Sequence, residues 1–468
     1  MSVDGPRPLA REACGLRRRA PVRIVHLGLG RFARSHVVRC TDLVDDAADW
    51  GVVGVGGRSD RTLAELDAQD DLYTLVTRAG DGDHFDRVAA LSATAAAADL
   101  QGWRAVLAAP ATAVVTLTVS EGGYALAPDG TLDLDAPAVR ADLDALRRGE
   151  ACTTTAGRLV DGLLARDRAD APPLAVVPCD NLSSNGARVS AAVRALADAA
   201  DPALADVVGA RAEFVSTVVD RITPATTPAD VVLVADVTGW ADPVPVVAEP
   251  WTEWVLCGAF PSGRPQWEDA GARFVDGIAT WEQRKLRLLN GAHSLLAYVG
   301  PLRGHRSVAG AMADDSCRAL VEAWWDEAAA GIDLAGDELA AYRGALAVRF
   351  ANTRIDHRLA LIAAGGSAKL PDRVVPTVRH AQRQARLAEG AVPVLAGWLC
   401  HLRGLGAPVD DPQADRLVAA AAGAWPAAAR RVLGTLGTDL AADDGLVAAV
   451  ADVAAAFAGT VRPVPREA

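Results

Sequence analysis

The side chains best suited to acid–base chemistry lie close together in the segment WEQRKLRLLNGAHS. This segment carries Glu282, Lys285, Asn290 and His293, which offer a carboxylate, an amine, an amide and an imidazole. At about 100° per residue, these four side chains span an arc of roughly 140° on one helix. A buried lysine can lose its proton and act as a base, whereas the guanidinium of arginine stays protonated. The segment therefore predicts a proton-transfer site centred on Lys285.

The scarcity of lysine in this chain strengthens the interpretation of Lys285 as a functional residue. Of the 47 lysines and arginines among the 468 residues, only Lys285 and Lys369 are lysines, and the chain has four asparagines. A codon bias explains why arginine replaces lysine wherever a surface cation suffices, so a retained lysine is a candidate for chemistry that arginine cannot perform. A solvated helix face is the alternative interpretation, but the leucines around Lys285 favour burial, and buried polar groups need partners or a ligand.

A second candidate segment is PCDNLSSNG, which contains Asn181 and Asn185. It follows the apolar run Leu174–Cys179, which has the length of a buried strand. In open parallel sheets, ligands bind beyond the carboxyl ends of the strands. We therefore expect Asn181 and Lys285 to meet at one site, across a domain boundary.

A glycine-rich turn near the N-terminus predicts a cofactor. The run Val22–Leu27 precedes GLGRFA, which fits the pattern GxGxxA. The first glycine permits a tight turn, the second lets the backbone approach a pyrophosphate, and the small third residue lets the helix pack on the strand. An ordinary strand–helix turn is the alternative. The candidate cofactor-binding residues of the turn are Gly28, Gly30, Arg31 and Phe32.

The region after the next strand decides which dinucleotide fits. An acidic residue there binds the ribose hydroxyls of NAD, and Asp60 is the candidate. Arg58 and Ser59 could instead accept the 2′-phosphate of NADP. The sequence favours NAD and leaves NADP open.

Strand-like and helix-like segments alternate over the first part of the chain. This pattern is typical of an α/β fold with a doubly wound, mainly parallel sheet of the Rossmann type, and after about residue 277 the pattern becomes helical. We predict a flexible lead-in at 1–20, a dinucleotide-binding domain at 21–277 and a helical substrate domain at 278–461. The expected strands are Val22–Leu27, Gly51–Gly56, Ala113–Val119, Leu174–Cys179, Val231–Val237 and Trp254–Cys257. The expected helices include Arg31–Val44, Ala138–Leu163 and Ala279–Val299.

Charge and composition exclude several classes of protein. A net charge of −12 with scattered cations argues against nucleic-acid binding. No apolar stretch approaches the roughly 20 residues of a membrane span, and we see no signal peptide. Seven widely spread cysteines suit the reducing cytoplasm. His36 and Cys40 could share a helix face, but nothing nearby completes a metal site and the chain has no CxxC or HExxH, so we expect no metal.

Together these segments resemble the polyol-specific long-chain dehydrogenases, the family of mannitol 2-dehydrogenase and fructuronate reductase. The likeness covers roughly residues 22–460, and the Lys-x4-Asn-x2-His spacing is specific to that family. It implies a metal-independent oxidoreductase with a nicotinamide cofactor, acting as a monomer or small homo-oligomer. The motifs that carry it are HLGLGRFARSH (26–36), TLTVSEGGY (116–124), PCDNLSSNG (178–186), VVDRITPATT (218–227), GRPQWEDAG (263–271), KLRLLNGAHSLLAYVG (285–300) and GGSAKLPDR (365–373).

The resemblance also implies roles for single residues. Lys285 matches the family's catalytic base, which takes the hydroxyl proton of the alcohol. Asn181 and Asn290 match the amides that hold the reacting oxygen, and His293 matches the histidine that orients the substrate. Asp220 and Lys369 match residues that contact the substrate in the family, and Glu282 matches a residue linked to proton exchange with solvent.

Two reactions of this family fit the sequence. One interconverts a sugar alcohol and its keto sugar, as with mannitol and fructose, and the other reduces a hexuronate such as fructuronate. Leu361 stands where mannitol dehydrogenases usually carry arginine, and IDHR (355–358) and KLPDR (369–373) are more like fructuronate reductases. We favour the sugar-alcohol reaction as the broader description. Lys369 and Arg373 also leave a sugar-phosphate dehydrogenase open, and a nucleotide-binding sensor without activity is a further alternative.

Overall fold

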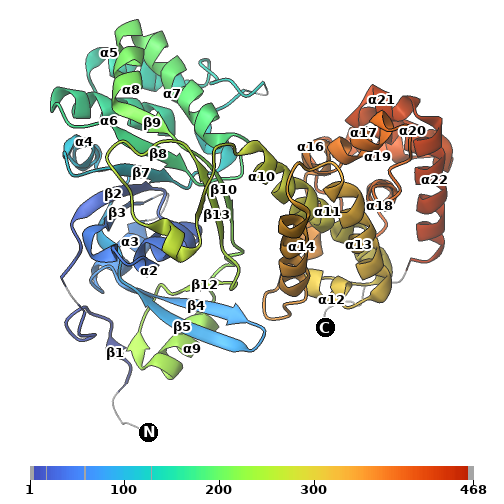
Figure 1. Ribbon diagram of the computed structural model, residues 1–468, viewed down its shortest axis with the longest axis horizontal. Helices are drawn as coiled ribbons and strands as arrows, with labels where there is room; N and C mark the ends of the chain where they lie inside the picture. The colour runs from blue at the N-terminus through green and yellow to red at the C-terminus, as the bar shows by residue number, and fades with distance from the viewer. Residues whose placement is uncertain (1–4, 17, 57–59, 128, 462–468) are drawn as a thin grey trace. The chain divides into compact units, whose positions relative to one another are not determined.

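The protein folds into two compact units, residues 1–279 and 280–468. A computed structural model describes residues 5–16, 18–56, 60–127 and 129–461 (Figure 1). The division falls close to the predicted boundary after residue 277.

A six-stranded sheet forms the centre of the first unit. All of its neighbouring strands are parallel, in the order β6-β3-β2-β7-β8-β9. The predicted Rossmann-type sheet is thereby confirmed. The strands are β2 (Val22–Leu27), β3 (Gly51–Val55), β6 (Leu91–Ala95), β7 (Val114–Leu117), β8 (Leu174–Pro178) and β9 (Ala212–Phe214).

Alternate side chains of this sheet enter two separate cores, because successive residues of a strand point to opposite faces. Val25 and Val115 pack in one core, and the preceding residues Ile24 and Val114 pack in the other. Such strands are buried on both faces, which explains their continuous apolar runs. The helices of the Val25 face are α4 (Leu100–Ala108), α5 (Pro137–Arg148), α6 (Thr155–Arg168), α7 (Asn185–Ala200) and α8 (Pro202–Arg211).

The opposite face is covered by the helix that follows the glycine turn. The predicted helix Arg31–Val44 is present as α1 (Arg31–Ala33), a π-helical turn η1 (Arg34–Val38) and α2 (Arg39–Leu43). The predicted helix Ala138–Leu163 is instead two helices, α5 and α6. The first of them ends at Gly149, which adopts the left-handed conformation (φ 71°) that glycine favours.

Three smaller sheets and several short helices complete the first unit. Strand β13 confirms the strand expected at Trp254–Cys257. The sheets are β12-β4-β5, with β4 (Tyr73–Ala79), β5 (Gly82–Val88) and β12 (Val246–Ala248); β10-β13-β14, with β10 (Ser216–Asp220), β13 (Glu253–Cys257) and β14 (Arg273–Phe274); and β1-β11, with β1 (Arg7–Pro8) and β11 (Trp240–Ala241). The helices are η2 (Ala47–Asp49), α3 (Asp60–Asp67), η3 (Glu121–Tyr124), α9 (Pro228–Thr238) and η4 (Trp267–Ala270).

The strand predicted at Val231–Val237 is wrong, because this segment lies in helix α9. Thr227 and Asp230 form a capping box, in which each side chain bonds the other's backbone N–H, and Pro228 occupies the first turn. These start signals outweigh the strand propensity of the valines. Val232 and Val237 are more than half exposed, so the apolar run does not mark a buried strand.

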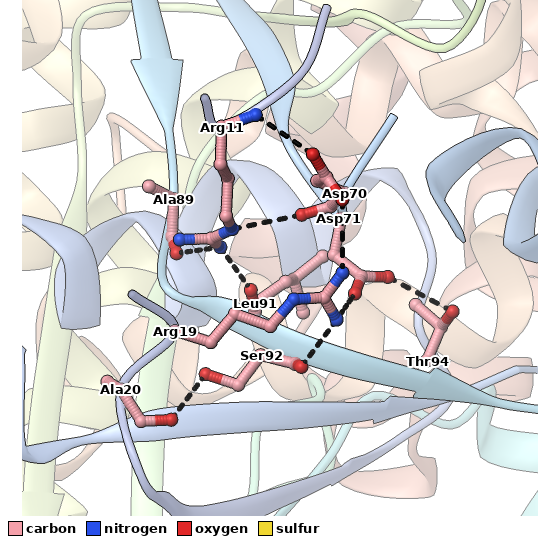
Figure 2. Close-up of polar contacts among 9 residues, drawn as sticks. All are labelled: Arg11, Arg19, Ala20, Asp70, Asp71, Ala89, Leu91, Ser92 and Thr94. Atoms are coloured by element: carbon pink, nitrogen blue, oxygen red, sulfur yellow. Dashed lines mark hydrogen bonds and ion pairs between the residues drawn. The ribbon is translucent and has the colours of Figure 1, made fainter. Parts of the chain in front are cut away.

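The described residues of the N-terminal segment pack against the rest of the first unit, although we expected a flexible lead-in at 1–20. Strand β1 pairs with β11, and Leu9 is buried against Trp240. Arg11 donates to the carbonyl oxygens of Ala89 and Leu91, both at 2.7 Å. Arg19 forms an ion pair with the fully buried Asp71 (Figure 2).

The second unit is helical, as predicted. Within its described residues, the only bridge between extended segments joins Ser307 and Arg358. No helix in the described part of the chain has the length and apolar character needed to cross a bilayer. The helices begin with α10 (Ala279–Arg284), η5 (Lys285–Gly291), α11 (Ala292–Val299), η6 (Pro301–Arg303), α12 (Val308–Met312), α13 (Asp315–Ala329) and α14 (Gly336–Phe350). They continue with α15 (Leu359–Ala363), α16 (Gly366–Arg373), α17 (Val375–Arg383), α18 (Val392–Leu402), α19 (Ala414–Ala421), α20 (Trp425–Leu436), α21 (Thr438–Ala442) and α22 (Asp444–Gly459).

Candidate active site

The glycine turn has the geometry that the sequence pattern predicts. Gly28 adopts a positive φ of 95°, and a Cβ there would lie 2.4 Å from the carbonyl oxygen of Thr118. Gly30 is the N-cap of α1, and a Cβ on it would meet only the Gly28 oxygen, at 3.8 Å, within 4 Å. The absence of a side chain at Gly30 thus leaves open space beside the turn.

That space belongs to a cavity of about 860 Å³. Its lining brings together predicted residues Gly28, Gly30 and Arg31 with Arg61 of α3. Asp60 begins α3, but its side chain and residues 57–59 lie outside the described residues, so the choice between NAD and NADP stays a prediction.

A second cavity of about 670 Å³ lies at the carboxyl ends of β7, β8 and β10. It brings together three predicted residues, Phe32, Asn181 and Asp220. Thr118 lines this cavity and the cavity of the glycine turn alike. The first unit therefore has a cavity at its strand ends that contains Asn181, while the meeting of Asn181 with Lys285 stays a prediction.

Asn185 holds the loop that carries Asn181. It is fully buried, and its side-chain amide donates to the carbonyl oxygen of Pro178 and to the hydroxyl of Thr217, each at 3.2 Å. Its oxygen accepts the N–H of Thr217 at 2.8 Å. The sequence marked Asn185 by its rarity without assigning it a role, and these bonds fix the loop against β10.

Tyr124 also fixes this loop, and the sequence did not point to it. Its hydroxyl donates to Asp180 at 2.5 Å, directly before Asn181. Burial, with the adjacent Asp180 carboxylate, raises the pKa of Tyr124 well above its usual value, so the hydroxyl stays a donor. Tyr124 ends the family motif TLTVSEGGY (116–124), but its role depends on a contact with Asp180, which lies 56 positions later in the chain.

Lys285 starts a π-helical turn inside the predicted helix 279–299. Elements α10, η5 and α11 follow one another without a break, and Lys285 is buried, with 9% of its surface exposed. The regular 100° spacing that placed Glu282, Lys285, Asn290 and His293 within one arc does not hold through η5, because a π-helix has more residues per turn. Single π-helical turns often occur at functional sites.

Two tryptophans of α13 bind this turn from outside. The indole N–H of Trp324 donates to the carbonyl oxygen of Arg287, and that of Trp325 donates to Leu288, each at 2.9 Å. Gly291 ends the turn, and a Cβ on it would lie 2.4 Å from the Trp324 ring. The π-helical turn is thus held by contacts with α13, which cannot be predicted from the residues of the turn itself.

His293 lies on α11 with a hydrogen-bonding atom unused. Its ring stacks on Phe350 (centroids 4.6 Å apart) and meets the edge of His357 at 4.7 Å. Within the described part of the chain, its buried Nε2 has no hydrogen-bond partner. Burial lowers the pKa of His293 well below its usual value, helped by His357 and the nearby arginines Arg349 and Arg373, so the ring is neutral.

Helix α16 carries the two remaining predicted substrate residues. Lys369 donates to the carbonyl oxygen of Ile362 at 3.3 Å. The guanidinium of Arg373 approaches the Ser294 hydroxyl at 3.5 Å, next to His293. Asp411 fixes the start of α16, since it accepts the N–H and the hydroxyl of Ser367 at 2.8 and 2.7 Å. The second unit therefore brings Arg373 close to His293.

The pair His36 and Cys40 is used for packing and hydrogen bonding. His36 bonds the carbonyl oxygen of Glu253 at 2.9 Å and stacks on Phe32. Burial raises the pKa of Cys40 to about 12, so the thiol that packs here is protonated.

Another group of potential metal ligands lies in the second unit. Atoms of His305, Asp314 and Cys317 lie within 4.8 Å of one another. Asp314 already accepts hydrogen bonds from Arg303 at 2.9 Å and from the backbone of Ser316 at 2.8 Å. Its carboxylate thus caps α13, which accounts for the group structurally.

Known proteins resemble this chain over most of its length. The D-mannonate oxidoreductase of Escherichia coli is 36% identical over 415 residues, which cover 86% of this chain and 84% of that protein. A mannitol 2-dehydrogenase of Pseudomonas fluorescens, solved as a ternary complex with NAD and D-mannitol, is 31% identical with a TM-score of 0.78, covering 98% of this chain and 95% of that one. A D-sorbitol dehydrogenase solved in substrate-free form is 30% identical with a TM-score of 0.87, covering 94% and 93%.

Family models divide the chain as the fold does. The mannitol dehydrogenase Rossmann domain matches residues 22–269, and the mannitol dehydrogenase C-terminal domain matches residues 277–457. Both matches agree with the parallel sheet of the first unit and the helices of the second. The chain is therefore an oxidoreductase of the mannitol dehydrogenase family.

Proposed function

We propose that this protein interconverts a secondary alcohol of an open-chain sugar alcohol and the matching keto sugar, with NAD as cofactor, Lys285 as the base and no metal. The observation that carries the proposal is the buried Nε2 of the neutral His293 ring, which has no hydrogen-bond partner among the described residues. His293 lies eight positions after the buried Lys285 in one continuous helical segment. A buried polar atom without a protein partner calls for an explanation, and a substrate hydroxyl supplies one.

The glycine turn fits a nicotinamide dinucleotide. Gly30 leaves open space beside the turn, and the adjoining cavity of about 860 Å³ is within the range of ligand sites. NAD, when bound, supplies the hydride acceptor for alcohol oxidation. The P. fluorescens relative, whose complex contains NAD, supports the same cofactor for this chain.

The residues of the chain then supply proton transfer and orientation. Lys285 is assigned the proton transfer: a neutral lysine amine accepts the hydroxyl proton, and in the reverse direction the ammonium returns it. The amides of Asn181 and Asn290 are assigned to the reacting oxygen, where N–H donors stabilise negative charge. His293 orients a hydroxyl through Nε2. The remaining assigned roles are substrate contact for Asp220, Lys369 and Arg373, and proton exchange with solvent for Glu282.

A sugar acid is the second candidate substrate. The imidazole of His293 lies within electrostatic reach of Arg349, Arg373 and His357. The two guanidinium groups, of Arg349 and Arg373, favour a substrate that carries a carboxylate, and the E. coli relative named D-mannonate oxidoreductase supports this class.

A substrate panel tests the reaction and separates the two candidates. Mannitol, sorbitol and arabinitol are assayed for oxidation, and fructose, fructuronate and tagaturonate for reduction, each with NAD(H) and NADP(H). We expect turnover of a sugar alcohol and its ketose with NAD(H). Preferred turnover of the uronates would select the second candidate, and no turnover of any compound would contradict the proposal.

Lys285→Met tests the base. We expect kcat to fall by about 10²- to 10⁴-fold, the usual contribution of a general base, while NADH still binds. Gln283→Met is the matched control, because it makes a similar change in the same helical segment outside the proposed machinery. A Lys285→Met enzyme with kcat close to that of the control would remove Lys285 from the mechanism.

A further inference from the structure

A fully buried histidine lies next to the glycine turn. His26 lies in β2, two residues before Gly28, and has no exposed surface. Its Nδ1 lies 2.7 Å from the hydroxyl of Thr116, and its Nε2 lies 2.9 Å from the hydroxyl of Thr118. Thr116 lies in β7, the strand next to β2, and Thr118 follows the end of that strand.

The hydrogens of this group can be assigned by counting donors. The Thr118 hydroxyl donates its one proton to the carbonyl oxygen of Gly28, at 2.7 Å. Nε2 of His26 must therefore donate to Thr118, and Nδ1 accepts the proton of Thr116, because a neutral imidazole has one donor and one acceptor. Burial lowers the pKa of His26 to about 4, so the ring is neutral at working pH.

This chain of hydrogen bonds ends on the peptide that forms the turn. The peptide between Gly28 and Leu29 is held from both sides: its carbonyl oxygen accepts from Thr118, and its N–H donates to the carbonyl oxygen of Val55 at 2.9 Å. Because a peptide is planar, fixing both groups fixes the direction in which the chain continues to Gly30.

Thr118 connects these hydrogen bonds to the two cavities described above, because it lines each of them. It lines the cavity beside the glycine turn and the cavity that contains Asn181. His26 lines neither cavity, so any effect of the imidazole on a ligand passes through the Thr118 hydroxyl or through the Gly28 backbone, which the ring also contacts.

We propose that His26 is a positioning residue for the dinucleotide, which orients the turn peptide through Thr118. The inference rests on the proposed function in that it requires a dinucleotide at the turn. It adds that a side chain outside the binding surface sets the affinity of that site.

Fluorescence titration with NADH tests this inference without any sugar substrate. His26→Leu removes both hydrogen bonds, and we expect the Kd for NADH to rise about ten- to a hundredfold, the effect of losing a buried hydrogen-bond pair. Where turnover is measurable, the KM for NAD should rise by a similar factor while kcat changes little. Thr112→Val is the matched control, since it removes a buried hydroxyl bond, to the carbonyl oxygen of Val106, in the same unit and away from both cavities.

Two conservative variants keep the test decisive if His26→Leu does not fold. In His26→Gln, the side-chain amide nitrogen can reach the Thr118 hydroxyl. In His26→Asn, the side chain is shorter and its amide reaches only toward Thr116. We expect the Gln variant to bind NADH nearly as the wild type does and the Asn variant to bind it weakly. Equal affinities of the two, or an unchanged Kd in a folded Leu variant, would overturn the role of His26. Failure of the wild type to bind NADH or NADPH would instead overturn the proposed function.

Discussion

The protonation state and the orientation of the His293 imidazole are set by the residues around it. Burial and neighbouring cations keep the imidazole neutral, and stacking on Phe350 fixes its plane. In a neutral ring, Nε2 donates to a substrate hydroxyl if it carries the proton, and accepts from the hydroxyl if Nδ1 carries the proton. His401 is comparable in burial, and its Nδ1 also has no partner in the described part of the chain.

His293→Phe tests this residue, because phenylalanine preserves the stacked ring and removes the nitrogen. We expect kcat/KM for the sugar to fall about ten- to a hundredfold, as for the loss of one hydrogen bond to substrate, with the Kd for NADH unchanged. The control is His401→Phe, which should leave steady-state kinetics unaltered. Equal kinetics of the two variants would show that His293 only fills space.

Single residues could be found from the sequence where their scarcity carried information. Lys285 and Asn181 were singled out in this way, whereas His293 was found by its spacing from Lys285, and the structure places Lys285 and His293 in one helical segment. Tyr124 and Asn185 act through partners that lie distant in the chain, so no local pattern assigned their roles. The bonds of His26 likewise depend on the neighbouring strand.

At the scale of elements, buried strands were the most predictable feature. β2, β3, β7 and β8 are apolar on both faces, and their predicted bounds differ from the observed ones by at most two residues at either end. The valines of α9 misled the prediction because a capping box and a proline decide that segment. The π-helical turn η5 was not predictable from periodicity, since the indoles that bind it come from α13.

Trp324→Phe tests whether those indoles position Lys285. The change removes one bond to the π-helical turn, so we expect about 1–2 kcal/mol less unfolding free energy and a clear fall in kcat. Trp103→Phe is the matched control, because Trp103 makes the same kind of bond, to the carbonyl oxygen of Arg158 at 2.8 Å, in the first unit. Similar losses of stability with kcat reduced only in Trp324→Phe are expected; an undiminished kcat would contradict the positioning role.

At the scale of the whole molecule, the described residues of the N-terminal segment belong to the folded protein. Its composition gave no sign of this, because the bonds of Arg11 and Arg19 reach residues more than fifty positions away. Asp71, which Arg19 pairs, has no exposed surface. Burial raises the pKa of Asp71 even though Arg19 opposes the shift.

Arg19→Ala should therefore destabilise the protein in a pH-dependent way. A carboxyl with a raised pKa costs stability once it ionises, and this cost disappears as the pH falls and the group is protonated. We expect a loss of about 2–4 kcal/mol at pH 8 that shrinks towards pH 4, measured by urea unfolding. Arg18→Ala, at the exposed neighbouring position, should show little change at either pH. A pH-independent difference between the two variants would argue against the ion pair between Arg19 and the buried Asp71.

The burial of Lys285 has a practical consequence for labelling. The sequence offers two side-chain amines, and one of them is hidden while Lys369 is only half-buried. An amine-reactive dye should therefore attach to the side chain of Lys369 well before that of Lys285. Such a chain would carry a fluorophore beside its proposed sugar site without any engineered cysteine, in a protein whose seven native thiols would otherwise complicate selective attachment.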